Sequence, residues 1–327
     1  MKKNKKKTLV GALAAVLLFS GCNIGGRQVI ITSGLGSQDV FRIGSASCKL
    51  TDAKVYLANY QNIYGKIYGI DLWKQGFLTD KLKKYVKDIA LSEMTKIVCM
   101  DLLAQERDIS LTEDELQATK TAAAEYYKSL NEEELEFTGA SETGIAAMYE
   151  KYALANKVYE SLTAGVDDEV SDDEARIMEA MQIFVKGKDE ADAVAAKLNA
   201  GEDFAAVASN YNQKPEIEIT FGRGELPKEA EEAAFELNND EISGCIAVEG
   251  GYYFIKCINK FNEELTDANK SKIVAAREKA AFDDVYEAFV LGLSSGLNEK
   301  VWDDITLITD GSIMTDSFFS VLEDAMD

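Results

Sequence analysis

The chain has 327 residues, with 35 lysines and arginines, 57 aspartates and glutamates, and no histidine. The formal net charge of −22 excludes nucleic acid as a favourable partner, since like charges repel, and the lack of histidine excludes a zinc site of mixed cysteine and histidine ligands. The length is typical of two domains or one large domain.

Residues 1–21 have the pattern of an export signal. The lysine-rich start MKKNKKK precedes the apolar run TLVGALAAVLLF at 8–19, and Ser20 and Gly21 stand directly before Cys22. This order resembles the lipobox of bacterial lipoproteins, which implies that Cys22 is lipidated. We expect an extracytoplasmic protein that is lipid-anchored to the cell membrane of a bacterium. An uncleaved membrane anchor is the alternative, although the apolar run is short for a bilayer span.

Residues 22–38 contain glycine and serine and are expected to form a flexible tether. After a short strand-like segment, VFRIGS at 40–45, apolar residues recur at steps of three and four up to about residue 170. Thr112 and Glu115 have the spacing of a capping box at a helix start. The pattern predicts an all-helical domain at 39–170. Its helices are rich in tyrosines that pack in the core or form a peptide-binding surface: Tyr56, Tyr60, Tyr64, Tyr68, Tyr126 and Tyr127.

The pattern changes at about residue 171. A strand is predicted within 175–187, helices at 189–201 and 203–211, a strand at 217–222, a helix after Pro227, and a hairpin at 245–259 that turns at Gly250 and Gly251. The order β-α-α-β-α-β-β over 171–262 is that of a compact α+β domain. In the remaining segment, 263–327, a long amphipathic helix from 266 to about 297 is expected to pack back on the N-terminal helices.

Four cysteines follow Cys22, and their spacing is not that of a zinc site. They are Cys48, Cys99, Cys245 and Cys257. Free thiols and disulfides are both compatible with an exported protein, so the sequence leaves the choice open.

The segments FGRGELPKEAEEAAF at 221–235, NNDEISGCI at 238–246 and GGYYFIK at 250–256 stand in the order and spacing of one family. With them, the second domain resembles the parvulin family of peptidyl-prolyl isomerases. The signal, the lipobox, the helical domain, this insert and the returning helix together resemble the PrsA- and SurA-type foldases. The resemblance implies a helical chaperone domain with an inserted parvulin-like domain.

The resemblance also implies where an active site lies, and this chain departs from the family there. The two family histidines fall at Gln182 and Tyr253, and the family's cysteine or aspartate falls at Lys214. These three are the candidate catalytic positions. The candidate substrate-binding residues are Phe221, Leu226, Ala230 and Phe235, where Leu226 and Ala230 replace the usual methionine and phenylalanine of the proline pocket.

Prolyl isomerisation breaks no covalent bond, so a histidine is not required as a proton carrier. Gln182 and Tyr253 can still form hydrogen bonds, and we expect them to pair across adjacent strands. The loss of an aromatic wall at Ala230 is the more serious change, since burying such a side chain against a ligand contributes about 1.5–3 kcal/mol.

We therefore expect a foldase that holds unfolded or partly folded exported polypeptides, with a weak or inactive isomerase domain. An active isomerase with an altered pocket is one alternative, and a solute-binding lipoprotein of a transporter is another. No metal or cofactor is implied. Partners are the unfolded clients and, through the lipid, the membrane; a homodimer is left open.

Overall fold

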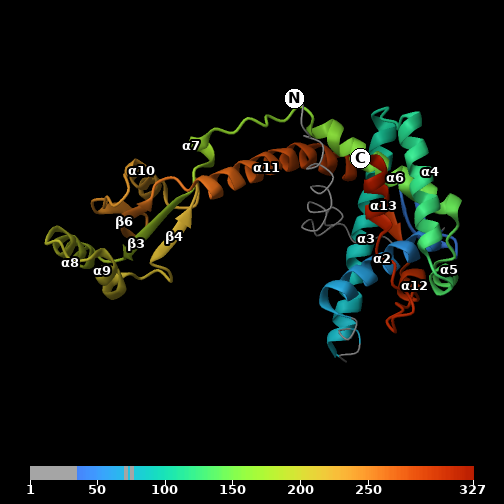
Figure 1. The fold of residues 1–327 in the computed structure, drawn as a ribbon, viewed down its shortest axis with the longest axis horizontal. Coiled ribbons are helices and arrows are strands. Elements are labelled where there is room, and N and C mark those ends of the chain that lie inside the picture. The colour runs from blue at the N-terminus through green and yellow to red at the C-terminus, as the bar shows by residue number, and fades with distance from the viewer. Residues whose placement is uncertain (1–34, 70–72, 74–76) are drawn as a thin grey trace. The chain divides into compact units, whose positions relative to one another are not determined.

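The computed structural model describes residues 35–69, 73 and 77–327. The predicted signal peptide, Cys22 and most of the tether lie outside these residues. The chain divides into two compact units, which we call unit 1 (Met1–Gly165 and Lys279–Asp327) and unit 2 (Val166–Glu278). Figure 1 shows the chain with its elements labelled. None of the described helices has the length and hydropathy needed to cross a bilayer.

Unit 1 combines helices with a small antiparallel sheet in the order β2-β1-β7. The prediction of an all-helical domain is therefore wrong in this respect. The strand-like segment predicted at 40–45 corresponds to β1, but its partner β7 comes about 250 residues later, and only the fold brings them together. The elements are β1 (Asp39–Ile43), β2 (Ala46–Lys49), α2 (Leu50–Tyr68), α3 (Phe77–Glu106), α4 (Glu113–Ser129), α5 (Glu132–Thr138), α6 (Glu142–Thr163), the end of α11 (Glu263–Val290), β7 (Ser295–Leu297), α12 (Glu299–Asp303) and α13 (Phe318–Met326).

Side-chain caps mark the starts of α4 and α5 in unit 1, whereas α2 begins at Leu50, after Lys49, without a side-chain cap. The predicted capping box is present at α4, where the Thr112 hydroxyl accepts from the Glu115 N–H and the Glu115 carboxylate accepts from the Thr112 N–H. A second box joins Asn131 and Glu134 at the start of α5. These bonds satisfy backbone donors that the first turn of a helix leaves without partners.

The core of unit 1 is rich in aromatic side chains. Phe318 of α13 is fully buried and its ring centroid lies 4.7–5.2 Å from those of Tyr56, Tyr126 and Tyr149. Two of the six tyrosines noted in the sequence, Tyr56 and Tyr126, are thus core residues, whereas Tyr68 is 63% exposed. Core packing is therefore confirmed for Tyr56 and Tyr126, and a peptide-binding surface that includes Tyr68 stays a prediction.

The end of α11 belongs to a second apolar cluster in unit 1. Phe282 is almost fully buried, and its ring centroid lies 5.2 Å from that of Tyr159 on α6. Met100 and Leu103 of α3 complete the contact. The apolar stripe of this part of α11 is thereby removed from water.

Unit 2 has the element order that the sequence predicts, and the α+β class is confirmed. Its four-stranded antiparallel sheet has the order β4-β3-β6-β5. The elements are α7 (Asp172–Ala175), β3 (Met178–Val185), α8 (Lys188–Asn199), α9 (Phe204–Tyr211), β4 (Glu218–Phe221), α10 (Lys228–Glu236), β5 (Ile246–Val248), β6 (Gly251–Asn259) and the start of α11.

Helices cover both faces of this sheet (Figure 1). Ile183, Val185 and Phe254 pack against α8 and α9 on one face. Ala180, Phe184 and Tyr253 lie on the other face, which packs against α10. This division follows from the period of two along each strand, which points successive side chains to opposite faces.

Candidate functional site

The candidate site lies on the α10 face of the unit 2 sheet. In the β3–β6 register Gln182 is opposite Ile255, and Phe184 is opposite Tyr253. Directly opposed residues of antiparallel strands share a face, and so do residues two apart on one strand. Gln182, Phe184 and Tyr253 therefore share one face, as the pairing hypothesis requires.

Gln182 and Tyr253 nevertheless do not bind each other. The Gln182 amide donates to the Glu216 carbonyl at 2.9 Å, and the Gln182 N–H donates to the Ile217 carbonyl at 2.7 Å. No hydrogen bond joins the side chains of Gln182 and Tyr253, both of which the structure describes. The expected direct pairing is wrong, since the Gln182 amide binds a carbonyl of the loop before β4 instead.

Phe184 contacts two of the three candidate catalytic positions, Tyr253 and Lys214. Its ring centroid lies 4.9 Å from that of Tyr253, and the Lys214 Nζ lies 5.0 Å from the Phe184 ring. Sequence analysis missed Phe184, although alternation along β3 places it on the face of Gln182. Gly251 allows this packing, since a Cβ there would lie 2.6 Å from the Phe184 ring.

The loop after α9 is tied to β3 through Asn212, a second residue that the sequence analysis missed. The Asn212 Oδ1 accepts from the Phe184 N–H at 3.0 Å, and its amide donates to the carbonyls of Lys214 and Glu216 at 3.1 and 3.0 Å. An asparagine after a helix commonly binds nearby backbone in this way. Asn212 thereby positions Lys214 near the ring of Phe184.

The four candidate substrate-binding residues differ in exposure. Phe221 of β4 and Ala230 and Phe235 of α10 are buried at 3%, 0% and 8% exposure, whereas Leu226 is half-buried. Phe221 and Phe235 contact each other edge to face, with centroids 5.6 Å apart. In this conformation Leu226 is the member of the four that offers side-chain surface to a ligand.

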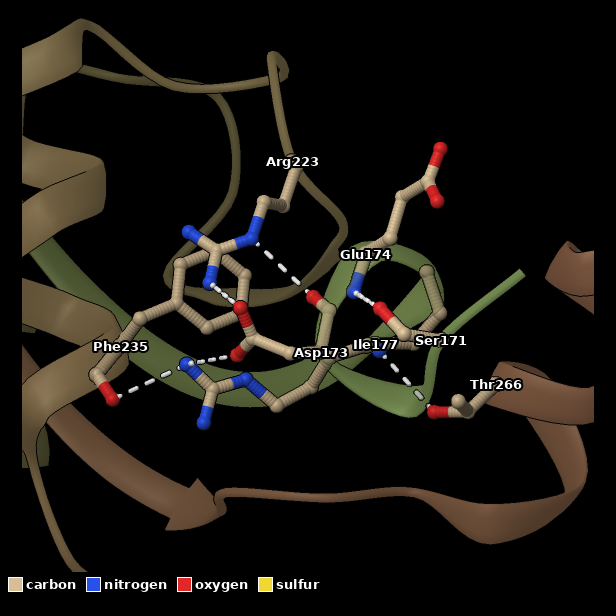
Figure 2. A network of polar contacts seen from close by, with 8 residues as sticks. Ser171, Asp173, Glu174, Ile177, Arg223, Phe235 and Thr266 are labelled. Carbon is tan, nitrogen blue, oxygen red and sulfur yellow. Dashed lines mark hydrogen bonds and ion pairs between the residues drawn. The ribbon is translucent and has the colours of Figure 1, made fainter. Parts of the chain in front are cut away.

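Two arginines flank the Phe235 ring and fix the loop that carries Leu226. The guanidinium carbons of Arg176 and Arg223 lie 4.4 and 4.6 Å from the ring centroid, within the range of cation–π contacts. Figure 2 shows the Asp173 carboxylate next to the Arg223 guanidinium; it lies 2.6 Å from Arg223 and 3.5 Å from Arg176, and so between the two arginines. The Arg176 guanidinium also donates to the Phe235 carbonyl.

Further bonds fix the same segment on either side. The Glu231 carboxylate of α10 accepts from the Gly224 N–H at 2.6 Å, and the Ile177 N–H donates to the Thr266 hydroxyl at 3.0 Å (Figure 2). The conformation of FGRG has a local cause: its arginine and second glycine are both held by carboxylates, those of Asp173 and Glu231. These residues form the frame of the candidate site.

The four cysteines in the described part of the chain are free thiols. Cys48, Cys99 and Cys257 are buried and Cys245 is exposed. Burial raises the pKa of the Cys257 thiol, which favours its neutral, unreactive form. The question that the sequence left open is thus answered in favour of free thiols.

Comparison with known proteins supports the parvulin resemblance. The family model of the PPIC-type PPIASE domain matches residues 157–269. The foldase protein PrsA of Geobacillus sp. (strain WCH70) is 24% identical over 297 residues, which cover 82% of this chain and 84% of that protein. PrsA of Geobacillus kaustophilus is 36% identical over 100 residues, 29% of this chain and 36% of its own length.

Among solved structures, the crystal structure of the peptidylprolyl isomerase PrsA from Bacillus cereus aligns with 90% of this chain and 98% of its own. The sequence identity is 19% and the TM-score is 0.37. The domain match at 157–269 and the PrsA relatives together support a PrsA-like foldase with a parvulin-type domain.

Proposed function

We propose that the protein is a membrane-anchored extracytoplasmic foldase that binds unfolded or partly folded exported polypeptides, and that its parvulin-type domain has weak or no isomerase activity. The proposal of weak or no isomerase activity rests on the burial of the candidate site residues. Gln182 and Tyr253, at the places of the family histidines, are 6% and 3% exposed, and Ala230 is fully buried. A prolyl ring cannot reach these positions unless the face opens.

A proline-limited refolding assay and an aggregation assay on the same full chain test this proposal. We expect suppression of the aggregation of an unfolded client with no acceleration of the proline-limited phase, which is slow and easily resolved. Acceleration that is abolished by Leu226→Ala or Tyr253→Phe would instead establish the active isomerase. That alternative retains some support, because Leu226 is accessible and Gln182 and Tyr253 share a face.

Ala230→Phe restores the residue type of the family. It distinguishes two causes of low isomerase activity: the lack of an aromatic wall in the proline pocket, and a sheet face that a ligand cannot reach. Because Ala230 is fully buried among apolar neighbours, we expect overpacking that destabilises unit 2 by about 1–3 kcal/mol. We expect no gain of isomerase activity. Ala233→Phe on the same helix, at a half-buried position, is the matched control. A stable Ala230→Phe variant with increased prolyl isomerisation would show that the face opens to a ligand.

The membrane anchor is proposed from the lipobox-like order before Cys22. Cys22→Ser is expected to abolish incorporation of a labelled fatty acid and to release the protein from the membrane fraction, because one thioether-linked lipid holds the mature chain. Cys245→Ser, which removes an exposed thiol, is the control and should leave both properties unchanged. Continued labelling of Cys22→Ser would favour another form of attachment.

The solute-binding alternative requires two α/β lobes with repeated strand–helix units. Unit 1 instead contains long helices and a three-stranded antiparallel sheet. The topology of the described residues therefore gives this alternative no support.

A further inference from the structure

A cavity of about 380 Å³ lies in unit 1 between the C-terminal half of α2 and the segment 308–316. Apolar side chains contribute much of its lining: Trp73, Ile308, Ile313 and Met314. The volume is within the range of ligand-binding pockets in proteins. Neither the parvulin-type site nor the core packing described above uses this cavity.

The wall formed by residues 308–316 is held firmly in place. The buried Glu134 carboxylate accepts from the Met314 N–H at 2.7 Å and from the Thr315 N–H and hydroxyl at 2.6 and 2.8 Å. On the other side, the amides of Gln61 and Asn62 donate to the carbonyls of Ile308 and Thr315. Bonds to a charged acceptor are among the stronger ones, so the cavity is preformed and binding needs little ordering of this wall.

The mouth of the cavity presents groups that suit a peptide. Met314 lines the cavity and is 66% exposed, although its backbone is fixed, so its flexible thioether is displayed to solvent. Gln61 also lines the cavity, and its Oε1 is buried without a hydrogen-bond partner in the described part of the chain. A buried acceptor left without a donor is costly, and a ligand N–H would satisfy it.

The charge around this wall selects among possible partners. The segment 299–327 contains eight acidic residues and one lysine. At the cavity itself the cation of Lys66 is paired with Asp316 at 2.8 Å. Anionic lipid and a second copy of this acidic chain would both be repelled, whereas a polypeptide rich in lysine and arginine would be attracted.

We infer that this cavity anchors an apolar side chain of an extended, basic segment of an unfolded polypeptide. The inference rests on the proposed holding function and names the surface that performs it. The exposed side chains Ile67 and Tyr68, on the last turn of α2 next to Lys66, extend the apolar surface along the same helix. The acidic surroundings attract the client, and the cavity then determines which side chain is retained.

The test is binding of a fluorescein-labelled peptide, rich in lysine and arginine around one central phenylalanine, to the full chain, measured by fluorescence anisotropy. Met314→Ser removes the displayed side chain, and Thr309→Trp fills the cavity from a half-buried position. We expect each to raise the Kd about ten- to a hundredfold, as the loss of one buried apolar contact implies. Leu291→Ser, which removes a side chain that is 62% exposed in unit 1, should leave the Kd unchanged.

Two peptide variants complete the test. Replacing the central phenylalanine by serine should weaken binding as much as Met314→Ser does, and replacing the basic residues by glutamate should abolish binding. Aggregation suppression by the same proteins separates the two proposals. One outcome is that the wild type suppresses aggregation while the wild type and both cavity variants bind the peptide equally well. This outcome would overturn the proposal that the cavity is the binding site, and the holding function would stand. Peptide binding at the cavity without suppression would overturn the holding function alone.

Discussion

Phe318→Ala is expected to lower the free energy of unfolding of unit 1 by about 3–5 kcal/mol, the usual cost of truncating a buried phenylalanine. Phe318 is fully buried and contacts the rings of Tyr56, Tyr126 and Tyr149. Its backbone is bound as well: the Phe318 N–H donates to the Asn59 Oδ1 at 3.0 Å, and the Tyr149 hydroxyl donates to its carbonyl at 2.6 Å. The tyrosine rings around it are themselves buried in the core, so a cavity should remain where the ring was.

Urea unfolding followed by tryptophan fluorescence isolates this effect, because both tryptophans of the chain, Trp73 and Trp302, belong to unit 1. This choice matters since a chain of two units need not unfold in a single transition. Leu291→Ala, at a side chain that is 62% exposed, is the control and should change the midpoint little. A loss below about 1 kcal/mol for Phe318→Ala would mean that α13 is not an integral part of the unit 1 core.

Glu93→Gln is expected to remove a pH dependence from the stability of unit 1. Burial raises the pKa of the Glu93 carboxyl from 4.5 to about 7 in the folded protein, and its Oε1 has no hydrogen-bond partner in the described structure. The titratable groups around it are Lys96 on its own helix and three tyrosines of α2 and α6, whose pKa values burial raises further so that they stay neutral: Tyr56, Tyr60 and Tyr152.

The sign follows from linkage. Between pH 4.5 and about 7 the folded state binds more protons at Glu93 than the unfolded state does. The contribution of this protonation to the free energy of unfolding is therefore complete below pH 4.5 and is lost as pH rises through about 7. The loss amounts to at most about 3 kcal/mol, because one pKa unit corresponds to about 1.4 kcal/mol. Glutamine cannot ionise, and the variant should become the more stable protein above pH 7.

Urea midpoints of wild type and Glu93→Gln, measured by tryptophan fluorescence across this pH range, should converge at low pH and separate as pH rises. Glu106→Gln, at an exposed position on the same helix α3, is the matched control and should follow the wild type. Parallel curves for wild type and Glu93→Gln would show that Glu93 ionises freely in the folded protein.

Local signals in the sequence predicted the elements of unit 2 well. The alternation in β3 and β6, the helix after Pro227 and the hairpin at Gly250 all depend on neighbouring residues, and each is present. The helix predicted at 266–297 was too long, since α11 ends at Val290 and Ser295–Leu297 forms β7. A strand of three residues that pairs with β1 across the chain has no local pattern to reveal it.

The candidate site was predictable in its residue positions but not in its contacts. Alternation placed Gln182 and Tyr253 on one face, which the register confirms. The partner of the Gln182 amide, Glu216, lies in a loop whose path depends on the bonds of Asn212. The direction of a side chain follows from strand periodicity, whereas its hydrogen-bond partner depends on which backbone the fold brings near.

The sequence by itself determined the α+β class, the order of elements in unit 2 and the resemblance to parvulins and PrsA-type foldases, because periodicity, capping and motif spacing are local properties. Only the tertiary structure decided that Ala230 and Phe235 are buried and that Phe184 lies among the candidate catalytic residues. It also decided that residues 308–316 close a cavity against α2. Burial and cavities arise from contacts between segments that are far apart in the chain, and no local pattern specifies them.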